Sequence, residues 1–188
     1  MARIRLVAGL GNPGKDYSET RHNAGFWWVE RLASRENAGL KMDARMHGLT
    51  GRIGETWLIE PQTFMNASGR AVSALSRFHR IDPDQILVVH DELDLEPGTV
   101  RLKFGGGHGG HNGLKDISAH LGTQNFWRLR LGIGHPGDRN QVSDYVLKRP
   151  RKEEEALIQD AIERSLETWP MILKGEQQAA MLRLHTKH

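Results

Sequence analysis

The fold class is decided by the segment Ile4-Arg5-Leu6-Val7-Ala8-Gly9-Leu10-Gly11-Asn12-Pro13-Gly14. Its compact apolar run ends in glycines, which is typical of a buried strand followed by a tight turn. Residues 24–33 then carry Phe26, Val29 and Leu32 at helical spacing behind Asn23, a residue type that caps helices. This order of strand, long turn and helix indicates an α/β architecture.

The alternation continues along the chain. Further strands are predicted at residues 56–60, 86–90, 100–104 and 128–133. Helices are predicted at residues 67–78, 112–121 and 153–169, and a second short helix is expected after the last of these. We therefore predict one α/β domain over residues 1–188, with a central mixed, partly parallel twisted sheet flanked by helices. Such sheets bind ligands at the carboxyl ends of their strands.

Composition narrows the possible chemistry. The chain has no cysteine, which removes disulfides, thiol nucleophiles and cysteine zinc sites. Its first ten residues are too short an apolar run for a signal or membrane segment, so we expect a cytoplasmic protein without membrane contact. Residues 101–150 hold 8 Lys/Arg against 3 Asp and no Glu. This local basic surface suits a polyanionic partner, although an ordinary solvated face would look the same.

The glycine turn at residues 9–14 formally matches a dinucleotide-binding fingerprint. In that fingerprint a helix begins at the last glycines, whereas here Pro13 removes an amide and polar residues continue to Arg21. The pattern favours a tight turn that brings the backbone and Asn12 to a substrate. A nucleotide-dependent enzyme remains the alternative, which titration with a dinucleotide would test.

His22 and Asp91 are the candidate proton-transfer pair. His22 stands just ahead of a predicted helix, and Asp91 directly follows a predicted strand, so both are expected at the same rim of the sheet. A carboxylate there can fix the tautomer of an imidazole and favour its protonated form. The alternatives are a structural histidine, a capping aspartate, or a cation bound by the acidic turn at residues 91–94, which lacks the other ligands of a dedicated site.

Asn12, Asn66 and Asn112 each follow a predicted strand at the mouth of a turn or helix. One such asparagine would be a cap, but three at one rim suggest amides that hold a polar substrate, its carbonyl or an attacking water. No serine lies in a nucleophile elbow. The residues therefore favour direct attack of water on a carbonyl, activated by a general base.

The stretch at residues 104–113 is unusually rich in glycine, which predicts backbone freedom, close approach to a ligand and a mobile loop. Its His108 and His111 are possible metal ligands, but no third ligand is evident. Nearby, Arg101, Lys103, Arg128 and Arg130 alternate on two predicted strands. They are expected to form a phosphate clamp, with a basic, solvated sheet edge as the alternative.

Six motifs together resemble the bacterial peptidyl-tRNA hydrolases, in family order and with family-like spacing. They cover nearly the whole chain: residues 9–14, Thr20-Arg21-His22-Asn23-Ala24-Gly25, Thr63-Phe64-Met65-Asn66, His90-Asp91-Glu92-Leu93-Asp94, residues 105–113 and residues 128–136. Arg101, where lysine is common, and a short connection at residues 122–125 depart from the pattern. Neither touches the expected chemistry.

The resemblance implies hydrolysis of the ester between a peptide and tRNA. This reaction would release tRNA for reuse in translation and would serve ribosome rescue. It implies a monomer with no metal, no cofactor and no obligate protein partner. By the same resemblance His22 accepts the proton, Asp91 supports it, and Asn12 separates peptidyl from aminoacyl substrates. The other implied contacts follow the family pattern. Asn66 and Asn112 hold the peptide end and the reacting water or carbonyl, Tyr17, Phe64 and Met65 line the cleft, and Lys103 and Arg130 clamp tRNA phosphate.

The glycine-rich loop and residues 137–142 would act as a movable gate. A non-catalytic RNA-binding protein of the same fold is the alternative. It predicts damage to the catalytic set, which is intact here.

Overall fold

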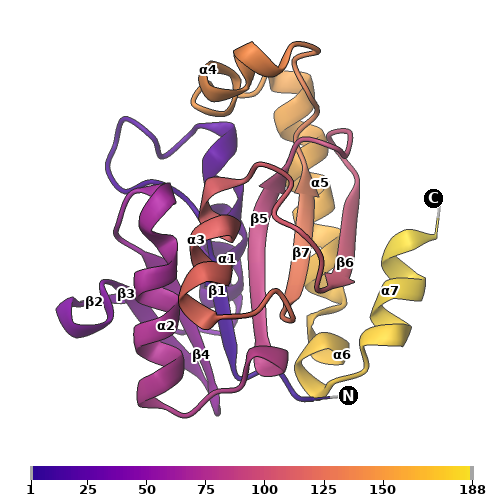
Figure 1. Cartoon of the computed structure of the whole chain (residues 1–188). Helices are drawn as coiled ribbons and strands as arrows, with labels where there is room; N and C mark the ends of the chain where they lie inside the picture. Colours follow the sequence, from indigo (N-terminus) through magenta and orange to yellow (C-terminus); the bar gives the residue numbers. More distant parts are fainter. Residues whose placement is uncertain (1, 187–188) are drawn as a thin grey trace.

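The computed structural model describes residues 2–186, which form an α/β fold around one mixed sheet (Figure 1). Seven strands are found in the described residues, in the order β2-β3-β4-β1-β5-β7-β6. Their bounds are β1 Leu6–Gly9, β2 Lys41–Asp43, β3 Gly48–Ile53, β4 Thr56–Pro61, β5 Ile86–Glu92, β6 Val100–Phe104 and β7 Trp127–Gly132. Strands β4, β1, β5 and β7 are mutually parallel, while β2, β3 and β6 run antiparallel to their neighbours. The predicted mixed, partly parallel sheet is thus confirmed.

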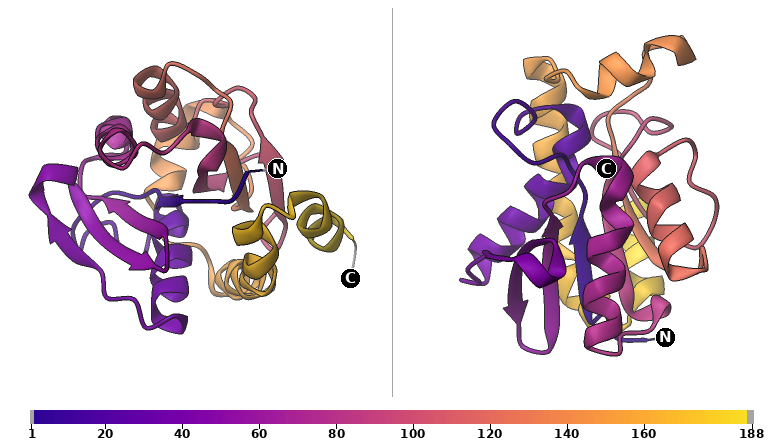
Figure 2. Two further views of the ribbon diagram at one scale, coloured as in Figure 1. Left: turned by 90° about the horizontal axis from the view of Figure 1, so that it is seen from below. Right: turned by 60° about the vertical axis from the view of Figure 1, so that its left-hand side comes forward.

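Helices cover both faces of the sheet (Figure 2). Their bounds are α1 Ala24–Arg35, α2 Ser68–Phe78, α3 Asn112–Leu121, α4 Val142–Val146, α5 Lys152–Glu167, α6 Trp169–Lys174 and α7 Gln177–His185. Helices α2 and α3 lie on one face, α1 and α5 lie on the other, and α7 lies beside the edge strand β6. Short 3-10 turns, among them residues 21–23 and 65–67, precede α1 and α2.

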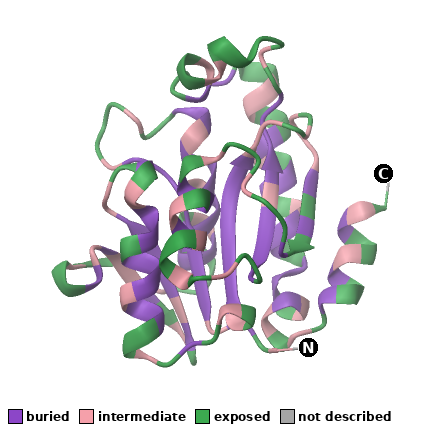
Figure 3. Ribbon diagram, viewed as in Figure 1, coloured by how far each residue is buried: buried purple, intermediate pink, exposed green. Residues whose placement is uncertain are grey.

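The pattern of β1 explains why it is central. Val7 packs into the core under α1 and α5, whereas Leu6 and Ala8 pack into the core under α2 and α3. A strand buried on both faces has no polar alternation, which is why it reads as a continuous apolar run. Figure 3 shows the central strands buried between their helices.

Two glycines let α1 approach this sheet closely. A Cβ on Gly9 would lie 2.4 Å from the carbonyl oxygen of Gly25, and a Cβ on Gly25 would lie 2.3 Å from that of Val89. Side chains at either position would push α1 away from β1 and β5. The close packing holds the turn before α1, with its His22, against the carboxyl ends of these strands.

The sequence pattern gave no prediction of β2, β3, α4 or a third helix in the C-terminal region. Strands β2 and β3 form an antiparallel extension of the sheet beyond β4. Both are short or partly exposed and carry few large apolar residues, so they give a weak pattern. The dinucleotide alternative for residues 9–14 is not favoured, because α1 begins ten residues after Gly14.

Candidate functional site

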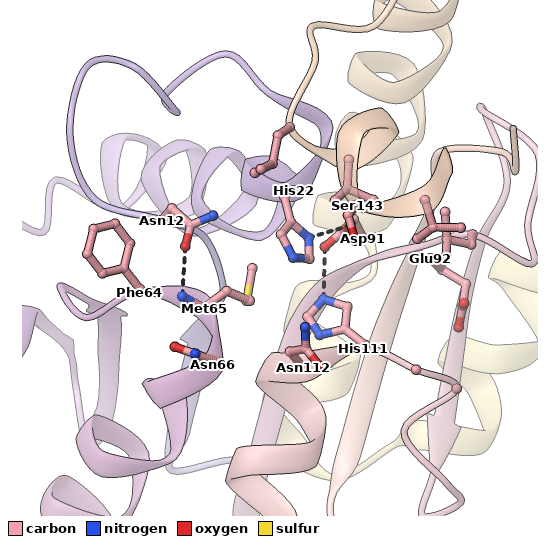
Figure 4. Close-up of a pocket in the computed structure, with 16 residues that line it drawn as sticks. Asn12, His22, Phe64, Met65, Asn66, Asp91, Glu92, His111, Asn112 and Ser143 are labelled. Atoms are coloured by element: carbon pink, nitrogen blue, oxygen red, sulfur yellow. Dashed lines mark hydrogen bonds and ion pairs between the residues drawn. The ribbon is translucent and has the colours of Figure 1, made fainter. Parts of the chain in front are cut away.

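A cleft of about 330 Å³ opens at the carboxyl ends of the parallel strands, where the topology rule places ligands (Figure 4). It is built by the turns after β1 and β4, the end of β5, the start of α3 and the α4 segment. The lining residues are Asn12, His22, Phe64, Met65, Asn66, Asp91, Glu92, Leu93, Gly109, Gly110, His111, Asn112, Val142, Ser143, Val146 and Leu147.

Asp91 lies at the centre of a three-residue hydrogen-bonded group at the floor of this cleft. Its Oδ2 is 2.8 Å from Nδ1 of His22, and its Oδ1 is 2.9 Å from Nε2 of His111. Asp91 is buried on β5, while His22 comes from the 3-10 turn before α1 and His111 is the N-cap of α3. Three elements distant in sequence therefore meet at one carboxylate.

Backbone hydrogen bonds assign the protons of this group. The amides of Gly113 and Leu114 donate to Nδ1 of His111, so that nitrogen is unprotonated and Nε2 carries the proton that His111 donates to Asp91. Asp91 likewise accepts from Nδ1–H of His22. The second nitrogen of His22, Nε2, is left with a lone pair, and Figure 4 shows it turned away from Asp91 into the cleft.

The charges of the group oppose the effect of burial. Burial lowers the pKa of His22, but the charge and hydrogen bond of Asp91 outweigh it and raise the pKa above the ordinary value of 6.5. Burial would raise the pKa of Asp91, yet its interactions with His22 and His111, which both donate to it, hold that pKa far below its usual range. Asp91 is thus ionised, and His22 is a stronger base than a free imidazole.

The same three side chains lie close enough for a metal site, because one ligand atom from each lies within 4.8 Å of the others. A metal bound to Nε2 of His111 would displace its proton, while Nδ1 already accepts two backbone amides. The ring would then have to become an anion or lose its capping bonds to α3. The hydrogen bonding therefore fits a His–Asp–His group better than a metal centre.

Asn12 is held in place by three hydrogen bonds. Its backbone N–H donates to Oδ1 of Asn23 at 2.9 Å, and its carbonyl accepts from Nδ2 of Asn23 at 3.0 Å. Its own Oδ1 accepts from the backbone amide of Met65 at 2.7 Å. Because the side-chain oxygen is used in this way, the amide nitrogen of Asn12 remains as a donor on the cleft side (Figure 4).

The structure brings Asn66 and Asn112 to the same cleft as Asn12. Both are exposed, and neither side chain has a hydrogen bond to another residue within 2–186. Phe64 lies on the rim with 60% of its surface exposed, and Met65 is buried beneath it. Tyr17, which was expected to line the cleft, is not among the lining residues; its ring meets that of Phe64 edge to face, with the two centroids 6.2 Å apart.

Lys103 and Arg130 lie in a second hollow of about 250 Å³ beside the glycine-rich loop. Arg101 is paired with Arg130, and Lys103 with Arg128, across the antiparallel strands β6 and β7. The side chains of these four basic residues therefore leave the backbone on the same face of the sheet. Nε of Arg130 donates to Oε1 of Glu92 at 2.9 Å, whereas Lys103 is exposed. Glu92 therefore orients Arg130 and neutralises part of its charge.

The prediction that Arg128 belongs to a four-residue phosphate clamp is wrong. It is buried, and its guanidinium donates to the carbonyls of Gly106, Gly107 and Gln124. These bonds use the donors that a phosphate would need, so Arg128 holds the glycine-rich loop instead. In that loop Gly105, Gly106, Gly109 and Gly110 have positive φ, which confirms the predicted need for glycine.

Sequence reasoning missed several residues of the site. His111 was considered only as a metal ligand, although its position directly before a predicted helix was a signal for a cap. Asn23 was identified only as a capping residue type. Val142, Val146 and Leu147 form one wall of the cleft, and the sequence pattern did not indicate it, because α4 is a single short turn of helix.

Comparisons with known proteins identify the family to which the chain is similar. The sequence model of the peptidyl-tRNA hydrolase family matches residues 6–188. The chain is 64% identical over 188 residues to a peptidyl-tRNA hydrolase of Nitrosospira multiformis, with 98% of each chain covered. It is also 64% identical to that of Thiobacillus denitrificans, covering all of this chain and 93% of the relative. The crystal structure of the Acinetobacter baumannii enzyme is similar with a TM-score of 0.95 at 47% identity, over 98% of this chain and 95% of that one.

Proposed function

Because this chain belongs to the peptidyl-tRNA hydrolase family, a family of ester-bond hydrolases, we propose that His22 is the general base with which it cleaves peptidyl-tRNA. The observation that carries the proposal is the lone pair on Nε2 of His22. It faces the cleft while Nδ1–H is held by the ionised Asp91 at 2.8 Å. A base held in one tautomer and strengthened by a carboxylate is what attack by water requires.

The reaction is an addition followed by an elimination. Nε2 of His22 takes a proton from water as the water oxygen bonds to the ester carbonyl carbon. The tetrahedral intermediate then collapses, the bond between carbonyl carbon and ribose oxygen breaks, and the leaving oxygen takes the proton back from His22. The products are tRNA with a free hydroxyl and a peptide with a free carboxyl group. The proposed reaction steps need no cofactor.

Amide groups provide the remaining polar contacts in this proposal. The free amides of Asn66 and Asn112 hold the peptide end and the reacting water or carbonyl, where a donor stabilises developing negative charge. Asn12, whose amide nitrogen stays available, distinguishes a peptidyl from a free aminoacyl group. Phe64 and Met65 form the apolar wall, and Tyr17 supports Phe64 through the contact between their rings.

We further propose that Lys103 and Arg130 bind a phosphate of tRNA in the second hollow. Lys103 is exposed, and Arg130 is oriented by Glu92, so one free and one positioned cation line the same space. The glycine-rich loop and the segment at residues 137–142 would gate the cleft. Among the described residues no helix is long and apolar enough to cross a bilayer. We propose a monomer that acts in the cytoplasm during translation.

The test is release of tRNA from an N-acetyl-aminoacyl-tRNA, measured with a chelator present. His22→Ala should lose about 10²- to 10⁴-fold in kcat, because a positioned general base contributes that much. The exposed His120, on α3, supplies a matched control, and His120→Ala should keep the wild-type rate. Hydrolysis by His22→Ala at the wild-type rate would exclude His22 as the base. Tight tRNA binding without any hydrolysis by the wild type would favour the RNA-binding alternative.

A further inference from the structure

Arg21, the residue before His22, has contacts that the proposed chemistry does not use. Its side chain is 7% exposed, which is unusual for arginine, and it points away from the cleft floor into the α4 segment. Nη1 donates to the carbonyl oxygen of Tyr145 at 2.9 Å, and Nη2 lies 3.3 Å from Oε1 of Glu154. The backbone amide of Arg21 donates to the carbonyl oxygen of Lys148 at 3.0 Å.

Tyr145 completes this arrangement. Cζ of Arg21 lies over its ring, 3.8 Å from the ring centroid. Its hydroxyl donates to the carbonyl oxygen of Ile133, just beyond β7, at 2.6 Å. Tyr145 therefore connects α4 to the sheet as well as to Arg21, whose side of the cation–π contact is buried.

The other side of the same short helix faces the substrate cleft. Val142, Ser143, Val146 and Leu147 line it opposite Asn12 and Phe64. Helix α4 has only five residues and is too short to be stable alone, so its position depends on contacts of this kind. Arg21 binds this helix from behind, while its neighbour His22 faces the cleft in front.

We propose that Arg21 is a positioning residue that fixes the distance between His22 and the α4 wall of the cleft. A planar guanidinium is suited to this task because it stacks on one group and donates to two others at once. Lysine has a point charge and cannot do all three. The inference rests on the proposed role of His22, since the distance matters for catalysis only if His22 acts on a substrate held against that wall.

Displacement of a base by a fraction of an ångström reduces the rate more than the affinity. In Arg21→Met and Arg21→Lys we expect kcat to fall about tenfold while KM changes less than about threefold. KM is expected to hold because the hollow with Lys103 and Arg130, which contributes tRNA binding, lies on the other side of β5. The acid limb of the pH profile should stay in place, because the pair of His22 and Asp91 is intact.

The matched control is Arg31→Met. Arg31 also links α1 to α5, through Glu163 and Gln159, but it does not contact α4. That variant should keep the wild-type kcat even if its melting temperature falls. A structural role alone would lower the melting temperature of the Arg21 variants and leave kcat per folded molecule equal to that of Arg31→Met.

Amide hydrogen exchange gives a readout independent of catalysis. The amides of residues 142–148 should exchange at least about tenfold faster in both Arg21 variants than in the wild type, because their anchor is lost. If Arg21→Met does not fold, the exchange and kcat measurements are made on Arg21→Lys alone. The proposal is overturned if residues 142–148 exchange at the wild-type rate in the folded variants, or if kcat matches the Arg31→Met control. Full activity of His22→Ala would instead overturn the proposed function, and the exchange result would still stand.

Discussion

Nε2 of His111 lies 2.9 Å from Oδ1 of Asp91, and this bond occupies the carboxylate oxygen that His22 does not use. The ring of His111 is itself fixed, because its Nδ1 caps the first turn of α3. Asp91 is thus held from both sides, and His111 sets the direction in which Asp91 faces His22.

The two bonds of His111 can be separated by substitution. His111→Ala removes both, so we expect a loss of about 1 kcal/mol in the free energy of unfolding from the cap, and a loss of about 10- to 100-fold in kcat. His111→Asn keeps a capping oxygen but is too short to reach Asp91. It should restore the stability and not the rate, measured by denaturant unfolding and by tRNA release. Equal rates for His111→Asn and the wild type would contradict a role through Asp91.

The activity should depend on pH through His22. As the proposed base, His22 must be neutral to accept a proton. Burial lowers its pKa, but the charge and hydrogen bond of Asp91 outweigh burial and raise the pKa above 6.5, so the wild-type rate should fall as the pH drops through a midpoint above 6.5. In Asp91→Asn only burial remains, and it lowers the pKa of His22. The midpoint should therefore move to lower pH while kcat falls by about 10²- to 10⁴-fold. Profiles of kcat between pH 5 and 9 would check this, and an unmoved midpoint would contradict it.

The second hollow, where Lys103 and Arg130 are proposed to bind phosphate, leads to a prediction about salt. Each phosphate contact adds about one unit to the slope of log affinity against log salt, so Lys103→Ala should reduce that slope by about one. Lys115→Ala, on the exposed side of α3, is the control and should leave the slope unchanged. Arg128→Lys should lower the melting temperature without changing the slope, since Arg128 binds loop carbonyls. The measurement is tRNA binding at a series of salt concentrations, and a reduced slope in Arg128→Lys would return that residue to the clamp.

The sequence predicted those parts of the fold in which apolar residues form a continuous run or recur at helical spacing. Leu6, Val7 and Ala8 are apolar because both faces of β1 are covered, and Phe26 and Val29 follow the helical period. The carboxyl ends of parallel strands meet at one rim, so the positions of Asp91, Asn12 and Asn66 could be inferred without knowing any contact. The roles given to them came from the resemblance of whole motifs.

The remainder depends on tertiary contacts that leave no local pattern. Arg128 and Arg130 have the same residue type and lie two positions apart on one strand, yet one is buried under loop carbonyls and the other is paired with Glu92. Only the fold of the loop distinguishes them. Likewise α4 is held by Arg21 from more than a hundred residues away, so its own five residues do not indicate a helix.

A buried carboxyl group outside the cleft makes the last prediction, on stability. Glu60 of β4 is 1% exposed, and its burial together with the charge and hydrogen bond of Glu30 on α1 raises the pKa of Glu60 to about 9. The folded protein therefore keeps the proton that the unfolded chain loses near pH 4.5. For a raised carboxyl pKa the stability falls as the pH rises from about 4.5 to about 9.

Glu60→Gln removes the ionisation and keeps a side chain of the same shape that can donate to Glu30. The variant should be more stable than the wild type by about 1–3 kcal/mol at pH 9, with little difference at pH 5. Glu55→Gln, on the exposed turn between β3 and β4, should follow the wild-type dependence. Urea unfolding at pH 5, 7 and 9 separates the cases. If Glu60→Gln loses stability with pH as steeply as Glu55→Gln, Glu60 is ionised in the folded protein and its pKa is not raised.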